Sequence, residues 1–248
     1  METPETAGMR TIHEIGSHAA AGFPVSVNPL RRSQPLQSLP ITPRGYPYPY
    51  HAKEMHMPQP RILFVIGSLR KGSFNQRLAD VAAKHLDGRA EISTLDYRDL
   101  PQFDQGEEFP APPSIADARE QVSQADAVWI FTPEYNYSYP GTLKNLLDWL
   151  SRPLDPTFQD KTTVLTGKKV ALTSAAGKSA GAGVRGKLTE ILDFLKSDLL
   201  GRQVGIVLPG EAFVTGEYEP SADDVKAVEL QADELLDSIA SSFRAIPA

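Results

Sequence analysis

The sequence contains no cysteine, which excludes disulfides, thiolate catalysis, zinc ribbons and cysteine-ligated iron–sulfur clusters. It also lacks any run of about 18 apolar residues, so it predicts no membrane-spanning helix. Basic residues are outnumbered, 25 against 31 acidic ones, and the net charge of −6 argues against a general affinity for nucleic acid. What is present is a chain of 248 residues with 41% hydrophobic residues, enough to bury a core without disulfide or metal staples.

Prolines are concentrated in the first 60 residues, which hold ten of the 21 prolines of the chain. Because a proline every few residues interrupts helices and strands alike, we predict an irregular N-terminal extension over residues 1–57. A single folded domain is predicted over residues 58–248. The extension is too weakly apolar near its start to be a signal peptide, so a cytoplasmic protein is expected.

Two further interpretations of this extension stay open. All four methionines of the chain lie in the extension, at positions 1, 9, 55 and 57, which allows the natural start to be Met55 or Met57. Four of the five histidines also lie in the extension, at His13, His18, His51 and His56. They allow a metal site there. They lack the spacing of metal ligands, so we favour an inert tail and predict no metal.

From residue 58 onward, short apolar runs alternate with amphipathic stretches. The runs are typical of strands buried on both faces of a parallel sheet and lie at 61–66, 90–95, 127–131, 169–173 and 204–208. The amphipathic stretches predict five helices. The first covers residues 75–86 with Asn75 as its N-cap, and the second begins at Ser114, in a pattern that resembles a capping box. The other three cover residues 141–151, the stretch from Leu188 to Leu199, and the chain from Ser221 onward. Five such units predict an α/β fold, a flavodoxin-like doubly wound parallel sheet of five strands in the order 2-1-3-4-5.

That fold predicts a ligand site outside the carboxyl ends of strands 1, 3 and 4, at residues 67–75, 132–141 and 174–186. The first loop brings glycines, hydroxyls and basic residues to the start of a helix, a combination that suits a phosphate. The bland alternative is an ordinary turn with solvated basic residues. The loop is not a Walker A motif, because Ser73 replaces the required lysine, and nucleotide triphosphate hydrolysis is disfavoured.

The second and third loops predict a surface for a flat heterocycle. The second is a polar loop with three tyrosines, held between Pro133 and Pro140, and it contains no pair of a nucleophile and a base. Its tyrosines could instead pack a subunit interface. The third loop is small and glycine-rich, and residues 181–186 fit G-x-G-x-x-G by chance, because a dinucleotide fingerprint belongs after the first strand.

Two segments carry a resemblance to a known family. They are Gly67-Ser-Leu-Arg-Lys-Gly-Ser-Phe-Asn75 and Pro133-Glu-Tyr-Asn-Tyr-Ser138 with the Pro140-Gly141 that follows. Together with residues 143–152 they resemble the NADPH-dependent FMN reductases, whose nearest members are quinone, chromate and azo-dye reductases. The resemblance covers about residues 58–243. It implies a flavodoxin-like fold, non-covalent FMN and a homodimer or homotetramer.

Carried over residue by residue, the resemblance implies three groups of cofactor-binding residues. The FMN phosphate would be held by Ser68, Arg70, Ser73, Phe74 and Asn75. The isoalloxazine ring would be lined by Pro133, Glu134, Tyr135 and Asn136 and covered at its far edge by Ser174, Ala176 and Gly177. No side chain is expected to be catalytic, because the flavin carries the chemistry. His85, the one histidine beyond residue 57, is expected to be structural.

The function predicted from this resemblance is an oxidoreductase that takes hydride from NADPH or NADH and passes electrons to a small acceptor by a ping-pong mechanism. A quinone, chromate or an azo compound would be the acceptor. Two alternatives remain. A flavodoxin-like electron carrier would share the fold and FMN, although Arg70 and Lys71 do not suit its phosphate loop. An arsenic-resistance-type flavin reductase often has an N-terminal extension, but its second loop usually lacks the pattern of residues 134–136.

An aromatic cluster next to the second loop predicts at least a homodimer. Trp149 lies off the apolar stripe of its helix, and Tyr137 and Tyr139 lie in the loop before it. Aromatic residues outside the core and beside a ligand site are typical of the centre of a protein–protein interface.

A shortened chain that begins at Met57 should fold, bind FMN and oxidise NAD(P)H, because the extension has too little apolar periodicity to supply a strand or core helix. Circular dichroism, the flavin spectrum and NAD(P)H oxidation of the shortened and full-length chains measure this. An insoluble or flavin-free product would mean that the extension is part of the fold.

Overall fold

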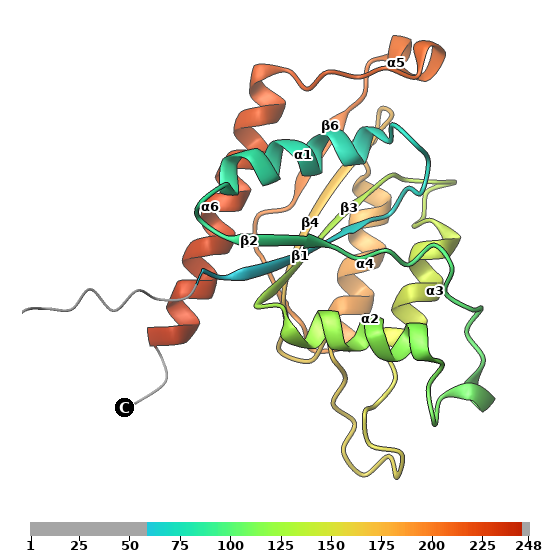
Figure 1. The fold of residues 1–248 in the computed structure, drawn as a ribbon. Coiled ribbons are helices and arrows are strands. Elements are labelled where there is room, and N and C mark those ends of the chain that lie inside the picture. The colour runs from blue at the N-terminus through green and yellow to red at the C-terminus, as the bar shows by residue number, and fades with distance from the viewer. Residues whose placement is uncertain (1–58, 245–248) are drawn as a thin grey trace, which may run out of the picture. The chain divides into compact units, whose positions relative to one another are not determined.

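The computed structural model describes residues 59–244, and the predicted extension, residues 1–57, lies outside them. Strands and helices alternate along the described part (Figure 1). The strands are β1 (Arg61–Ile66), β2 (Glu91–Thr94), β3 (Ala127–Thr132), β4 (Lys169–Ala176), β5 (Asp198–Leu199) and β6 (Val204–Val207). The helices are α1 (Phe74–Leu86), α2 (Pro113–Gln124), α3 (Gly141–Leu150), α4 (Ala182–Phe194), α5 (Gly210–Thr215) and α6 (Ala222–Arg244), with a short 3-10 turn η1 (Gln105–Glu107). None of the helices described is long and apolar enough to cross a membrane.

The strands form one parallel sheet in the order β2-β1-β3-β4-β5, which confirms the predicted α/β fold and strand order. The fifth position differs from the prediction, because two short strands share it. β5 pairs with the start of β4 at Lys169 and Val170, and β6 pairs with its end from Thr173 to Ala176.

The continuous apolar runs are explained by helices on both faces of the sheet. On one face, Phe64, Trp129 and Phe131 pack with α1 and α6. On the other face, Leu63 and Val128 pack with α2, α3 and α4. Because successive side chains of a strand point to opposite faces, a strand covered on both sides needs apolar residues throughout, and all six residues of β3 are buried.

Three local predictions are wrong. The N-cap of α1 is Ser73 rather than Asn75, which is buried inside the first turn. α2 is preceded by Pro112, and no side-chain cap is formed by Ser114. α4 ends at Phe194, and Leu199 belongs to β5, since its backbone pairs with Val170 of β4.

The predicted exposure of Trp149 is also wrong: its side chain is 1% exposed. The chain between β2 and α2 covers the outer face of α3 at this point. The indole Nε1 donates to the carbonyl of Pro101 at 2.9 Å, and the ring meets Phe103 edge to face at 4.9 Å. Trp149 therefore belongs to the packing of α3 and contributes nothing to an exposed aromatic cluster.

Two further predictions are confirmed, namely that His85 is structural and that Ser221 opens the last helix. His85 Nε2 lies 2.9 Å from Asp233 Oδ1, and Arg89 bonds the same oxygen at 2.7 Å, so His85 helps to join α1 to α6. Ser221 precedes α6 and forms a reciprocal cap with Asp224, whose carboxylate accepts from the Ser221 N–H while the Ser221 hydroxyl accepts from the Asp224 N–H.

Candidate functional site

The loops that follow β1, β3 and β4 meet at the carboxyl edge of the sheet, as the strand order requires. The first two loops approach closely. The N–H of Gly67 donates to the Phe131 carbonyl at 2.7 Å, and a Cβ placed on Gly67 would lie 2.4 Å from Thr132 Oγ1. A side chain at position 67 would therefore push the first loop away from β3, and only glycine fits.

The first loop ends at the N-terminus of α1, which no side chain of the described chain caps. Ser73 makes no side-chain capping bond, and the first turn contains no acidic residue. Helix N-termini carry unpaired N–H groups and a positive partial charge, so this end attracts an anion. Arg70 and Lys71 precede it, and the Arg70 guanidinium lies 4.7 Å from the centre of the Phe74 ring.

The loop's other predicted residues have different surroundings. Ser68 is 8% exposed, and its hydroxyl lies 3.4 Å from the Tyr135 hydroxyl of the second loop. Ser73 is buried. Phe74 packs edge to face against Phe213 of α5 and against Tyr218.

Asn75 holds α1 against the sheet. Its Oδ1 accepts from the Ala175 N–H at 2.9 Å, and its Nδ2 donates to the Ala175 carbonyl at 3.3 Å. Both ends of the amide are therefore engaged inside the protein, and the side chain is 2% exposed. Asn75 thus contributes to the site mainly by fixing the start of α1 beside β4, a role that the sequence position alone does not reveal.

The second loop contains a tight turn. Tyr135 and Ser138 exchange two backbone hydrogen bonds of 2.9 and 3.0 Å, and the residues between them, Asn136 and Tyr137, have φ values of 51° and 61°. Positive φ at both central residues defines a type I′ turn, which asparagine tolerates and tyrosine does not favour. Tyr137 is 79% exposed, so core packing does not compensate for this backbone strain, and strain of this kind is typical of functional sites.

Glu134 connects the second loop to the start of α4. Its Oε1 accepts from the Ser179 hydroxyl at 2.7 Å, and its Oε2 accepts from the Val184 N–H at 2.9 Å. A Cβ on Gly183 would lie 2.8 Å from Oε2, so a small residue is needed there. The carboxylate thus occupies the N-terminus of α4 and acts as an internal anion.

The pKa of Glu134 reflects this position. Burial alone would raise it, but hydrogen bonds from Ser179, Val184 and Gly183 together with the charge of Arg185 outweigh burial and hold the pKa below its ordinary value. Glu134 is therefore ionised at neutral pH, as a helix N-terminus requires.

The third loop is held by a bond network around Ser174 at the end of β4. The Ser174 hydroxyl donates to the Ala180 carbonyl at 2.7 Å and accepts from Arg185. Ala176 is buried at the end of β4, and Gly177 follows it, partly exposed. Two glycines of the G-x-G-x-x-G match have a packing explanation: Gly183 lies against Glu134, and Gly181 has φ 74° and a Cβ there would lie 2.4 Å from Ser174 Oγ.

A residue that the sequence predictions missed is Tyr97, which follows β2. It is 3% exposed, its hydroxyl donates to the Ile66 carbonyl at 2.7 Å, and burial raises its pKa above the ordinary value. This bond fixes the end of β1, where the first loop begins. No motif signals it, since the segments that carry the resemblance do not include the loop after β2.

The geometry of three converging loops agrees with the comparison to known proteins. A profile described as NADPH-dependent FMN reductase matches residues 60–208. The chain belongs to this family. The predictions of family, enzyme and cofactors are thereby confirmed: this FMN reductase-family protein is an oxidoreductase that uses FMN and NAD(P)H.

Individual relatives agree. A quinone reductase from Escherichia coli is 40% identical over 148 residues, which are 57% of this chain and 74% of that protein. An NAD(P)H-dependent FMN reductase from Pseudomonas aeruginosa is 34% identical over 136 residues, 54% of this chain and 70% of that protein. The solved structure of FerB, a flavoenzyme NAD(P)H:(acceptor) oxidoreductase from Paracoccus denitrificans, matches with a TM-score of 0.62 and 28% identity over 73% of this chain and 98% of FerB.

The residues present fit FMN. The uncapped end of α1, with Arg70 and Lys71 beside it, has the donors and the charge that a phosphate monoester needs. In the turn of the second loop, Tyr135 and Ser138 use their N–H groups internally, whereas those of Asn136 and Tyr137 donate to nothing in residues 59–244. Two such donors suit the carbonyl and nitrogen edge of an isoalloxazine ring.

Replacing Glu134 by Gln should loosen the start of α4, because an amide cannot accept at both ends as the carboxylate does. We expect a loss of about 0.5–2 kcal/mol in the free energy of unfolding, the range of a helix N-cap, and faster hydrogen exchange at the Val184 amide. Glu190→Gln on the exposed face of α4 is the matched control.

We also expect Glu134→Gln to change how the stability of the protein depends on pH. A carboxyl whose pKa is lowered on folding stabilises the protein above the unfolded-state pKa of about 4.3, and this contribution is lost as pH falls through the folded pKa. The acid loss of stability should therefore be smaller in Glu134→Gln than in the wild type. Equal acid profiles and an unchanged Val184 amide would contradict the role of Glu134.

Proposed function

We propose that this chain is an NAD(P)H-dependent quinone reductase in which FMN binds with its phosphate at the N-terminus of α1 and its ring against the second loop. The observation that carries the proposal is the uncapped start of α1 at the switch point of the sheet, with two basic residues and no acidic residue beside it. Bound FMN supplies the hydride and electron transfer.

The chain's own residues bind the FMN and orient it. The N–H groups at the start of α1 and the guanidinium of Arg70 neutralise the phosphate, and the nearby Ser68 and Ser73 supply hydroxyls. Asn75 keeps that end of α1 in place through Ala175. The N–H groups of Asn136 and Tyr137 hold the polar edge of the ring.

The remaining residues surround the proposed position of the isoalloxazine ring. Pro133 is buried and fixes the start of the second loop, and Tyr135 is half exposed beside Ser68. Glu134 acts on the ring indirectly, by joining the second loop to α4. Ser174 and Ala176 are buried at the end of β4, so Gly177 is the part of the third loop that lies nearest to a ligand's far edge.

A quinone is the acceptor that the relatives favour. Besides the E. coli protein, a 2-hydroxy-1,4-benzoquinone reductase from a Burkholderia species is 41% identical over 93 residues, although the chain spans only 51% of it. Both substrates would use one open face of the flavin in turn, which predicts a ping-pong mechanism. Chromate and azo compounds are the other acceptors to be assayed. We place the enzyme in the cytoplasm and treat residues 1–57 as an extension outside the catalytic domain.

The proposed enzyme works as a homodimer or homotetramer. With Trp149 buried, the support comes from the second loop, where Tyr135 and Tyr137 are 49% and 79% exposed beside the proposed ring site. Sedimentation equilibrium of the FMN-loaded protein should give at least twice the chain mass of 27.1 kDa. A fully active monomer at micromolar concentration would contradict this part of the proposal.

Replacing Arg70 by Ala should weaken FMN binding by about 10- to 100-fold, the loss expected for one charge-assisted hydrogen bond, and leave the fold intact. Titration of the apo-protein with FMN measures this. The control is Arg202→Ala, which removes an exposed arginine that lies just before β6 and pairs with Glu234 of α6.

Steady-state assays of NAD(P)H oxidation with benzoquinone test the activity itself. The wild type should give parallel lines in double-reciprocal plots at several quinone concentrations. Unchanged FMN affinity in Arg70→Ala would remove that residue from the site, and a flavin-loaded protein that fails to oxidise either nucleotide would contradict the proposed function.

A further inference from the structure

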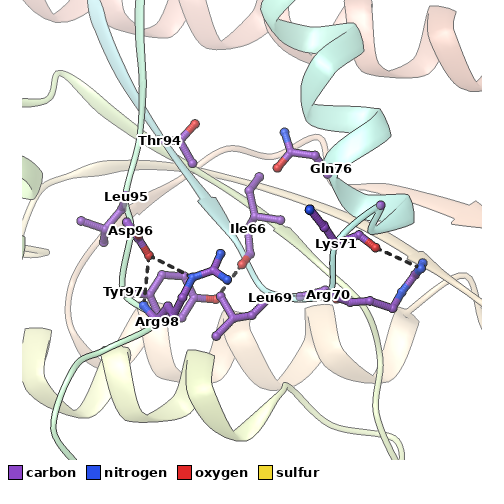
Figure 2. Close-up of a pocket in the computed structure, with 12 residues that line it drawn as sticks. Ile66, Leu69, Arg70, Lys71, Gln76, Thr94, Leu95, Asp96, Tyr97 and Arg98 are labelled. Atoms are coloured by element: carbon purple, nitrogen blue, oxygen red, sulfur yellow. Dashed lines mark hydrogen bonds and ion pairs between the residues drawn. The ribbon is translucent and has the colours of Figure 1, made fainter.

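A cavity of about 620 Å³ lies beside the first loop, on the side of β2 rather than of β3. Its residues come from the end of β1, the first loop, the start of α1 and the chain that follows β2 (Figure 2). Its volume lies within the range of about 300–1,000 Å³ that is usual for small-molecule sites. The proposed FMN site, in contrast, lies over β1, β3 and β4, so the cavity is a second space that shares the first loop.

The floor of this cavity is apolar and fixed. Ile66, Leu69, Leu95 and Tyr97 line it, and the Tyr97 hydroxyl is bonded to the Ile66 carbonyl. That bond satisfies the hydroxyl, and Ile66, Leu95 and Tyr97 are only 6%, 3% and 3% exposed, so the floor is closed and contains no unpaired polar group. A closed apolar floor suits the face of a flat base such as adenine.

The rim of the cavity is polar and mainly basic. Arg70, Lys71 and Arg98 carry three positive charges around it, and Asp96 is the carboxylate among the lining residues. Figure 2 shows Arg98 beside Asp96, whereas Arg70 extends away from them towards the Lys71 carbonyl. The cations are therefore spread around the opening, and an anionic ligand could meet Arg98 without displacing Arg70 from the FMN phosphate.

Arg98 is available to a ligand. Its Nε lies 3.6 Å from Asp96 Oδ1, and the side chain is 59% exposed. The terminal nitrogens of its guanidinium have no hydrogen-bond partner in residues 59–244. A guanidinium whose Nε lies near a carboxylate and whose two terminal nitrogens are unpaired can donate two parallel hydrogen bonds to a phosphate monoester.

The cavity and the proposed ring site adjoin at Ser68. This residue lines the cavity, and its hydroxyl lies 3.4 Å from Tyr135 of the second loop. A ligand with two ends could therefore place one end near the flavin and the other in the cavity.

We propose that this cavity binds the adenosine end of NADPH, with the base on the apolar floor and the 2′-phosphate on Arg98. The inference rests on the proposed function, since it concerns the electron donor of the same site. It makes Arg98 the residue that selects NADPH over NADH, because NADH lacks the phosphate that the guanidinium recognises.

The direct test uses 2′,5′-ADP, which carries the 2′-phosphate but no nicotinamide, and calorimetry on the full-length, FMN-loaded protein. The wild type should bind 2′,5′-ADP at least about tenfold more tightly than AMP, which lacks the 2′-phosphate. Arg98→Ala should remove this difference and retain FMN. Lys226→Ala, an exposed lysine of α6, loses the same charge and should leave the difference unchanged.

Steady-state kinetics supply the second readout. In Arg98→Ala, kcat/KM for NADPH should fall about 10- to 100-fold, whereas kcat/KM for NADH should stay within about threefold of the wild type. Asp96→Asn, which removes the competing carboxylate, should retain the preference for NADPH.

Three results would overturn the inference. One is equal binding of 2′,5′-ADP and AMP by the wild type. The others are a loss of FMN in Arg98→Ala and an equal fall in kcat/KM for NADPH and NADH in that variant, because the cavity would then belong to the flavin. A failure of the proposed function is distinguishable from all three, since it would abolish oxidation of NADPH and NADH while the calorimetric comparison still reports on the cavity.

Discussion

Backbone N–H groups at the starts of helices are the constraint on which this site depends. In a parallel sheet the helices begin at the carboxyl edge, so several N-termini with unpaired donors and positive partial charge converge there. Two of them are satisfied from within the chain: α4 by the carboxylate of Glu134, and α6 by Ser221 and Asp224. The start of α1, which follows β1 and the basic residues of the first loop, has no such side chain. Its donors are therefore left for a ligand.

The same edge is held together by polar contacts that cross between segments. Glu134 joins the second loop to α4, Asn75 joins α1 to β4, and Ser68 approaches the second loop at Tyr135. None of these contacts belongs to the hydrophobic core, whose two halves lie on either face of the sheet. Packing therefore sets where the strands end, and the polar contacts set how the loops face one another. This division lets the cofactor site and the cavity beside β2 share one loop.

The sequence predicts those parts of the fold that depend on local pattern. β1 and β3 are recognisable because both faces of the sheet are covered, which leaves continuous apolar runs. The first loop is recognisable because its chemistry is complete within nine residues. In contrast, β5 exists only because its two residues pair with β4. The burial of Trp149 depends on a chain segment 46–48 residues earlier, which covers α3 at Pro101 and Phe103.

Roles within the site follow the same rule. Pattern marks Glu134 and Asn75 as site residues, but their hydrogen bonds reach Val184 and Ala175, which are 50 and 100 positions away. Hydrogen-bond partners so distant in the sequence can be identified only once the fold has brought their segments together. Tyr97 shows the extreme case, because it lies outside every motif and still fixes the end of β1.

The central claim is that the uncapped start of α1 binds a phosphate, and the most direct test compares FMN with riboflavin, which differs only by that phosphate. Titrations of the apo-protein should show FMN binding about 100-fold or more tightly than riboflavin, since at least two charge-assisted hydrogen bonds are lost with the phosphate. This difference should shrink in Arg70→Ala. Equal affinities for FMN and riboflavin in the wild type would contradict the account.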